Sequence, residues 1–70
     1  MHWEQVVGQN IRKARKARGL TQQQLALEAE LDLRYLGGIE RGEQNPSVAV
    51  VGRLAEVLEV HPGDLFDEGK

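Results

Sequence analysis

Apolar residues recur along this chain at the three- and four-residue spacing that gives a helix one apolar face. In the first such segment Val7, Ile11 and Ala14 are separated by polar and basic residues. No stretch shows the strict alternation of a half-buried strand, so the pattern predicts an all-α fold. Five helical segments are expected, at about residues 3–18, 21–29, 32–41, 47–58 and 62–66.

Capping residues mark where these segments begin and end. Thr21 precedes the second segment, and Gln24 three residues later completes a capping box, in which each side chain accepts a hydrogen bond from the other residue's backbone N–H. The other expected caps are Asp32 for the third segment, Asn45 or Ser47 for the fourth, His61 for the fifth, and Gly19 and Gly42 at the ends of the first and third.

The inward faces of these segments are expected to meet in one small core, because a chain of 70 residues can bury only a modest share of its surface. The residues expected inside are Val7, Ile11, Ala14, Leu25, Ala26, Ala29, Leu36, Ile39, Val48, Val51, Leu54, Ala55, Leu58, Leu65 and Phe66. Glu30 stands in the turn between the second and third segments. If that turn needs a left-handed residue, Glu30 costs about 1 kcal/mol there.

Composition narrows the classes of protein. The chain has no cysteine, and its longest apolar run, residues 48–51, is far below the roughly 20 residues that a membrane helix needs, so a cytoplasmic protein is expected. His2 and His61 have no partner at a metal-ligand spacing, and no nucleophile or paired-acid motif is present. We therefore expect neither a metal, nor a cofactor, nor enzymatic activity.

Charge is unevenly distributed along the chain. The net charge is only −2, but residues 1–27 hold five basic residues and one acidic residue, whereas residues 28–70 hold ten acidic and four basic ones. A weakly acidic protein is a poor general ligand for phosphate, yet a basic end can still dock on DNA if that end is presented.

Short motifs across most of the chain resemble the Cro/C1-type helix-turn-helix family of regulators. The residues that carry the resemblance are Asn10-Ile11-Arg12, Arg15, Arg18-Gly19-Leu20-Thr21-Gln22, Leu25-Ala26, Tyr35-Leu36, Ile39-Glu40-Arg41-Gly42, Asn45-Pro46-Ser47 and Leu54-Ala55. The resemblance implies a five-helix, lambda-repressor-like DNA-binding domain, with the second and third helices as the motif. Within the family, the run from Leu31 to Ser47 looks most like the controller proteins of restriction-modification systems.

Three positions depart from the family pattern. Glu30 stands where the motif turn usually has glycine, and Gln44 stands where the family often has a cation. Arg34 lies one place later than the arginine that commonly follows the aspartate. These departures bear on the details of DNA contact rather than on the fold.

The resemblance assigns roles to residues of the motif. It implies DNA base readout by Asp32, Leu33, Arg34 and Gly38, and DNA backbone contact by Thr21, Gln22, Tyr35, Gly37, Arg41 and Asn45. Arg34 is the best candidate for pairing with guanine, because a guanidinium can bind guanine O6 and N7 together. For Leu33 the alternatives are contact with a thymine methyl group and a lone surface leucine, and for Tyr35 they are a phosphate contact and packing on the core.

The adjacent glycines of the third segment cost about 1 kcal/mol each relative to alanine. Close approach of the backbone to DNA would explain them, and positions under little packing demand are the alternative. Elsewhere, the resemblance implies a structural ion pair between Arg15 and Glu40.

A homodimer is expected, because three apolar residues lie beyond the main inward stripe of the last two segments: Val50, Val57 and Phe66. Trp3 would cover the edge of that surface. The partners expected are thus double-stranded DNA and a second copy of the chain, with no membrane. No effector-binding domain is expected, and hence no small-molecule ligand.

These observations predict a sequence-specific transcriptional regulator that reads a near-palindromic operator through the major groove. Repression would follow from blocking polymerase, and activation from contact between the acidic flank and RNA polymerase. One alternative is a protein-interaction module of the same fold that does not bind DNA, suggested by the acidic balance, the double glycine and the missing loop cation. An antitoxin component, which would also bind DNA, is another.

Overall fold

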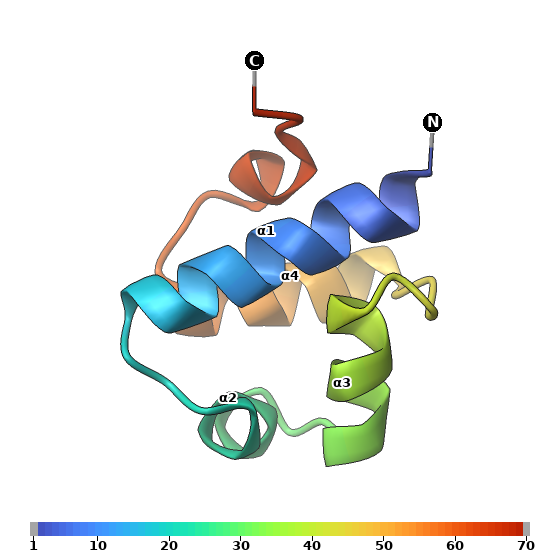
Figure 1. Ribbon diagram of the computed structural model, residues 1–70. Helices are drawn as coiled ribbons and strands as arrows, with labels where there is room; N and C mark the ends of the chain where they lie inside the picture. The colour runs from blue at the N-terminus through green and yellow to red at the C-terminus, as the bar shows by residue number, and fades with distance from the viewer. Residues whose placement is uncertain (1, 70) are drawn as a thin grey trace.

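The computed structural model describes residues 2–69, and Figure 1 shows its elements in chain order. They are α1 (Trp3–Ala17), α2 (Gln22–Glu28), α3 (Leu33–Glu40), α4 (Val48–Leu58) and a short 3-10 helix, η1 (Pro62–Phe66). The described part of the chain contains no strand, which confirms the all-α fold. The fifth segment, expected to be helical, is a 3-10 helix. Helices of this kind, with i→i+3 hydrogen bonds, are common in short pieces such as this one of five residues.

The predicted caps define the helix starts. Thr21 Oγ1 accepts from the backbone N–H of Gln24, and Gln24 Oε1 accepts from that of Thr21, both within 3.0 Å. Asp32 caps α3, and His61 caps η1 through its Nδ1. Of the two candidates for α4, Ser47 is the cap, since its Oγ accepts from the backbone N–H of Val50.

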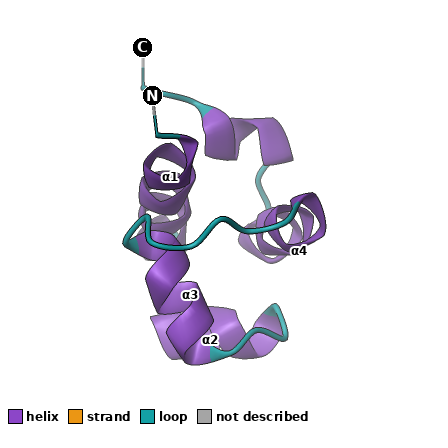
Figure 2. Ribbon diagram, turned by 90° about the vertical axis from the view of Figure 1, so that its right-hand side faces the viewer, coloured by secondary structure: helices purple, strands orange, loops and turns teal. Residues whose placement is uncertain are grey.

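The core lies where α1 crosses α3, α4 and η1, with α2 closing it from the side of α3 and α4 (Figures 1 and 2). Its largest fully buried side chains are Ile11, Leu25, Leu36, Ile39, Leu54, Leu58 and Leu65. Two expectations are wrong: Val48 is 88% exposed and Phe66 is 42% exposed. Val48 is the first residue of α4 and lies at the margin of its apolar stripe, so no other element covers it.

Gly8 brings α1 into close contact with the end of α3. A Cβ atom at this position would lie 2.1 Å from the carbonyl oxygen of Ile39 and 3.0 Å from that of Glu40. Any larger residue would therefore push the two backbones apart. This glycine sets how closely α1 rests on α3.

The turn between α2 and α3 contains a residue in the left-handed conformation, the possibility raised for Glu30 from the sequence. Glu30 has φ of +58°, which is an unfavourable conformation for a residue with a Cβ atom. Glu59, which ends α4, has φ of +59°. Gly42 ends α3 with φ of +77°, as expected of a C-terminal glycine.

The segment after η1 returns to the first helix. Asn10 Nδ2 donates to the carbonyl oxygens of Leu65, at 2.9 Å, and Asp67, at 2.7 Å. The C-terminal segment consequently lies on the side of α1 that faces away from α2 and α3 (Figures 1 and 2). The helix pair α2–α3 forms the opposite side of the molecule.

Candidate nucleic-acid interface

The candidate interface is the outer side of α2, the turn of residues 29–32, and α3 (Figure 2). Leu36 and Ile39 anchor α3 to the core, with Glu40 one position further along. At 3.6 residues per turn, Arg34 and Gly38 then lie on the opposite side of α3, one turn apart. This is the surface that α3 presents away from the protein.

Arg34 is an exposed cation on this surface. Its backbone N–H donates to Asp32 Oδ1 at 2.8 Å, but its guanidinium has no hydrogen bond or ion pair within residues 2–69. Leu33 beside it is 45% exposed. A free guanidinium next to an accessible apolar side chain can serve base readout, because the first can bind guanine and the second a thymine methyl group.

Asp32 has a structural task at the start of α3. Its Oδ1 accepts from the backbone N–H groups of Arg34, at 2.8 Å, and Tyr35, at 3.3 Å. This cap fixes the direction of α3 and places Arg34 at its first turn. Tyr35 is half-buried and packs against the core, in keeping with the second of its two sequence interpretations.

Gly37 and Gly38 are buried, which corrects the expectation that they leave an open stretch of backbone. A Cβ atom on Gly37 would lie 3.1 Å from Nη1 of Arg41, and one on Gly38 would lie 2.8 Å from Cγ of Gln44. Both glycines are on the outward side of α3, but the side chains of Arg41 and Gln44 lie over them. This part of the helix therefore presents two later side chains to solvent.

The loop after α3 carries the remaining backbone-contact candidates. Arg41 is exposed, and its Nε lies 3.1 Å from Oε1 of Glu43 in a surface ion pair. Asn45 is also exposed, and no side-chain hydrogen bond joins it to another described residue. A surface pair of this kind is worth at most about 1 kcal/mol, so a phosphate can compete with Glu43 for Arg41.

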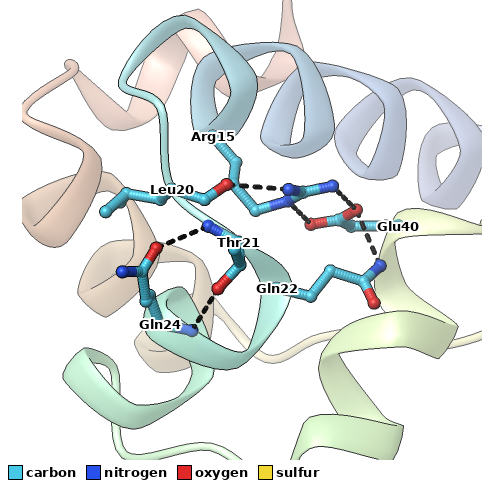
Figure 3. Close-up of polar contacts among 6 residues, drawn as sticks. All are labelled: Arg15, Leu20, Thr21, Gln22, Gln24 and Glu40. Atoms are coloured by element: carbon cyan, nitrogen blue, oxygen red, sulfur yellow. Dashed lines mark hydrogen bonds and ion pairs between the residues drawn. The ribbon is translucent and has the colours of Figure 1, made fainter.

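A buried polar network joins α1, α2 and α3 behind the candidate interface (Figure 3). Arg15 Nε donates to Glu40 Oε2 at 2.8 Å and its Nη2 donates to Oε1 at 3.1 Å, so the pair implied by the resemblance is present in bidentate form. Arg15 Nη1 also donates to the carbonyl oxygen of Leu20 at 2.8 Å. No buried side-chain nitrogen or oxygen of the described residues lacks a partner.

Gln22 belongs to this network as well as to the surface. Its Nε2 donates to Glu40 Oε1 at 3.0 Å, and the residue is half-buried at the start of α2 (Figure 3). Glu40 thus holds both the end of α3 and the first residue of α2 in place. Thr21, beside it, is exposed and uses its hydroxyl for the capping box.

Basic side chains are exposed along α1, and Lys13 among them borders two hollows beside the segment after η1. Arg12, Lys13 and Lys16 have no ion pair with another described residue, whereas Arg18 pairs with Glu59 at 2.6 Å. The unpaired ones give α1 a positive surface. The acidic residues Glu28, Glu30 and Glu56 instead border, together with Arg53, a polar hollow between α2 and α4.

The predicted dimer residues fall in two places. Phe66 and Trp3 are 42% and 49% exposed, and their rings meet edge to face with centroids 6.2 Å apart. Together with Val7, Pro46 and Val51 they line a shallow hollow. Val50 and Val57 are half-buried and pack against the core, and Val57 borders the polar hollow near α2 instead.

Residues 2–69 contain no group of three or more acidic, histidine or cysteine side chains placed to hold a metal ion. None of their helices is both long and apolar enough to cross a bilayer.

The sequence interpretation missed three residues with clear structural roles: Gly8, Asn10 and Gln44. A glycine between the inward residues Val7 and Ile11 was a usable signal of close helix packing. The other two could not be found in this way. Asn10 binds a segment more than fifty residues later, and Gln44 reaches back onto α3 from the loop that follows this helix.

Comparison with known proteins agrees with this geometry. The profile of the Helix-turn-helix family matches residues 11–65. The immunity repressor of Bacillus phage phi105 is 42% identical over 62 residues, which make up 89% of this chain and 43% of that protein. Control protein C.BamHI of Bacillus amyloliquefaciens is 36% identical over 61 residues, 86% of this chain and 75% of that protein.

A solved structure is similar along almost its whole length. The restriction-modification controller protein C.AhdI from Aeromonas hydrophila superposes with a TM-score of 0.86 at 41% identity, and the match covers 90% of this chain and 96% of that one. The family consists of DNA-binding proteins that are not enzymes. The matched residues include all of α2, the turn and α3. The chain therefore belongs to the Cro/C1-type helix-turn-helix family of transcriptional regulators.

Proposed function

We propose that this chain is a sequence-specific transcriptional regulator that binds a near-palindromic operator as a homodimer, with α3 in the major groove. The observation that supports it best is the outer side of α3, where the Arg34 guanidinium is exposed and unpaired while the Arg15–Glu40 pair braces the helix from behind. A helix held in this way can enter a groove without losing its direction.

The proposed contacts divide by chemistry. Arg34 reads a guanine, Leu33 contacts a thymine methyl group, and Asp32 lies beside the same bases. The backbone candidates are Thr21, Gln22, Tyr35, Arg41 and Asn45, and the exposed cations of α1 draw the protein toward the duplex. The three carboxylates at the polar hollow between α2 and α4 favour weak binding of random DNA and thus reliance on base contacts.

The homodimer is proposed to use the exposed apolar surface around Phe66 and Trp3. Two protomers related by a twofold axis would place their α3 helices in successive major-groove faces, about 34–36 Å apart. The operator would then be an inverted repeat with half-sites about one helical turn apart.

Repression by blocking polymerase is the simplest outcome of such binding. We propose activation through RNA polymerase as the alternative, because Glu28, Glu30 and Glu56 offer an acidic surface that α3 does not use. Transcription in vitro from a promoter that carries the selected operator, with and without the protein, distinguishes the two directions.

The proposal is tested by selecting bound duplexes from a random pool, followed by binding measurements across salt concentrations. A regulator is expected to enrich one inverted repeat and to lose affinity steeply with salt, since each neutralised phosphate releases counterions. Lys16→Ala should reduce the salt slope without changing the selected sequence. Failure to bind any duplex at low salt would contradict the proposal and favour a protein-interaction module.

A further inference from the structure

Gln44 lies against the outer side of α3, although it belongs to the loop that follows this helix. Its Cγ is 2.8 Å from the place where a Cβ atom of Gly38 would stand, its Nε2 is 3.5 Å away and its Cδ is 3.6 Å away. The side chain of Gln44 therefore fills the volume in which a side chain of residue 38 would lie.

That volume is on the side of α3 that carries Arg34. Residues 34 and 38 are one turn apart, or about 6 Å along the helix axis, which corresponds to about two base-pair steps of roughly 3.4 Å each. A polar side chain at this place would face bases close to those that Arg34 faces. Gly38 itself has no side chain with which to read a base, so the position needs a donor from elsewhere.

The amide of Gln44 is free to make such contacts. Gln44 is exposed, and its side chain has no hydrogen bond or ion pair with any residue from 2 to 69. A carboxamide carries both a donor and an acceptor and can bind the N6 and N7 atoms of adenine together. Because glutamine is neutral, it attracts a phosphate much more weakly than the cation that the family often has at this position.

We propose that Gln44 is a base-reading residue. Its amide, held over Gly38, recognises an adenine within about two base pairs of the guanine that Arg34 contacts. This inference rests on the proposed DNA-binding function. It also gives a reason for glycine at position 38, because any Cβ atom there would displace Gln44 from this place. The recognition surface is then built from α3 and its following loop together.

The test compares the sequences that the whole chain and its Gln44→Ala variant select from a random duplex pool. The wild-type motif should contain an adenine in each half-site near the Arg34 position, and Gln44→Ala should lose the preference there while keeping the rest. The affinity of the variant for the wild-type site should fall about tenfold, which is the usual effect of losing a bidentate base contact. A circular dichroism melt should be unchanged, since the side chain is exposed.

Gly38→Ala provides an independent test through displacement of Gln44. It should lose preference at the same base pair, and the double variant Gly38→Ala/Gln44→Ala should select the same motif as Gln44→Ala. Gln9→Ala, an exposed glutamine on α1, is the matched control and should leave the motif unchanged.

Three results would overturn the inference. If Gln44→Ala selects the wild-type motif with equal affinity, Gln44 reads no base, although the proposed function stands. If the variant binds more tightly, Gln44 covers α3 and must move aside for DNA. If the wild-type chain selects no sequence at all, the proposed function and the inference fail together.

Discussion

Arg15 is a charged side chain that α1 carries into the interior, with only 11% of its side chain exposed against 2% for that of Glu40. Burying one charge without a partner costs several kcal/mol, so each charge here depends on the other. Gln22 and the Leu20 carbonyl satisfy the remaining donors and acceptors that the pair presents. A few side chains thus fix three helix ends at once.

Removing one member of this pair should be costly. Arg15→Ala or Glu40→Ala is expected to lower the free energy of unfolding by about 3–5 kcal/mol, because the remaining charge stays buried. The double variant should lose much less than the two single losses added together. Urea unfolding followed by circular dichroism measures all three.

The matched control is the exposed pair of Arg18 and Glu59, for which the same cycle should give a coupling of at most about 1 kcal/mol. Strict additivity of the Arg15 and Glu40 losses would show that the two charges do not stabilise each other.

Arg34 provides the second prediction at this scale. Arg34→Ala should relax the preference for guanine at one base pair in each half-site, at a cost of about 1–3 kcal/mol in discrimination. Competition binding to the selected operator and its single-base variants measures it. Arg53→Ala removes an exposed arginine of α4, away from α3, and should leave the preference intact. A guanine preference that survives Arg34→Ala would remove this residue from base readout.

Between elements, the position of α3 depends on the close approach of α1 at Gly8. Helices usually lie 8–10 Å apart, and small residues at the crossing allow the shorter separations. Here the missing Cβ atom leaves room for the carbonyl oxygens at the end of α3. The orientation of the candidate recognition helix is consequently coupled to a residue of α1 that contacts its end directly.

Gly8→Ala is expected to destabilise the fold despite the better helix propensity of alanine. The added Cβ atom would lie 2.1 Å from the Ile39 carbonyl oxygen, and overpacking of this kind costs about 1–3 kcal/mol. Gly52→Ala is the matched control, since a Cβ atom there meets nothing within 4 Å and alanine should stabilise α4 by about 1 kcal/mol. Thermal and urea unfolding compare the two. If Gly8→Ala and Gly52→Ala melted at the same temperature, the close contact of α1 with α3 at Gly8 would not contribute to stability.

The helices themselves could be predicted because their determinants are local. Thr21, Gln24 and Asp32 are capping residues that indicate helix starts in the sequence, and the spacing of apolar residues indicates which helix faces are buried. Exposure at helix ends could not be predicted in this way, as Val48 shows: periodicity says which side a residue is on, but not whether another element extends far enough to cover it.

The candidate site could be predicted only in part, and for a related reason. Register places Arg34 and Gly38 on one side of α3, whereas the side chains that cover Gly37 and Gly38 come from residues beyond the end of the helix. No periodic pattern encodes a loop side chain that folds back. The sequence interpretation therefore found the right helix face but not all of the groups that it presents.

Across the whole molecule, the exposed aromatic pair lies apart from the candidate interface. Trp3 and Phe66 meet beside the start of α4, unpaired cations lie on α1 and α3, and a polar hollow bordered by three carboxylates lies between α2 and α4. Single exposed apolar residues are common, but two adjoining aromatic rings at the surface of so small a protein favour self-association.

Phe66→Glu should weaken the homodimer at least tenfold, because burying a phenylalanine contributes about 1.5–3 kcal/mol. Sedimentation velocity over a range of protein concentrations gives the dissociation constant. Leu27→Glu places the same charge at an exposed leucine of α2 and should leave association unchanged. A wild-type chain that sediments as a monomer at all concentrations, or an unaltered dimer of the variant, would exclude this surface.

The hydrogen bonds of Asn10 to the segment after η1 have a practical consequence. Because they hold that segment on the side of α1 remote from α2 and α3, a fluorophore or an affinity tether joined there would stand clear of the duplex (Figure 1). Immobilising the protein on a biosensor through this end should preserve its affinity, and cutting the tie with Asn10→Ala would allow the attached group to swing toward the reading helix.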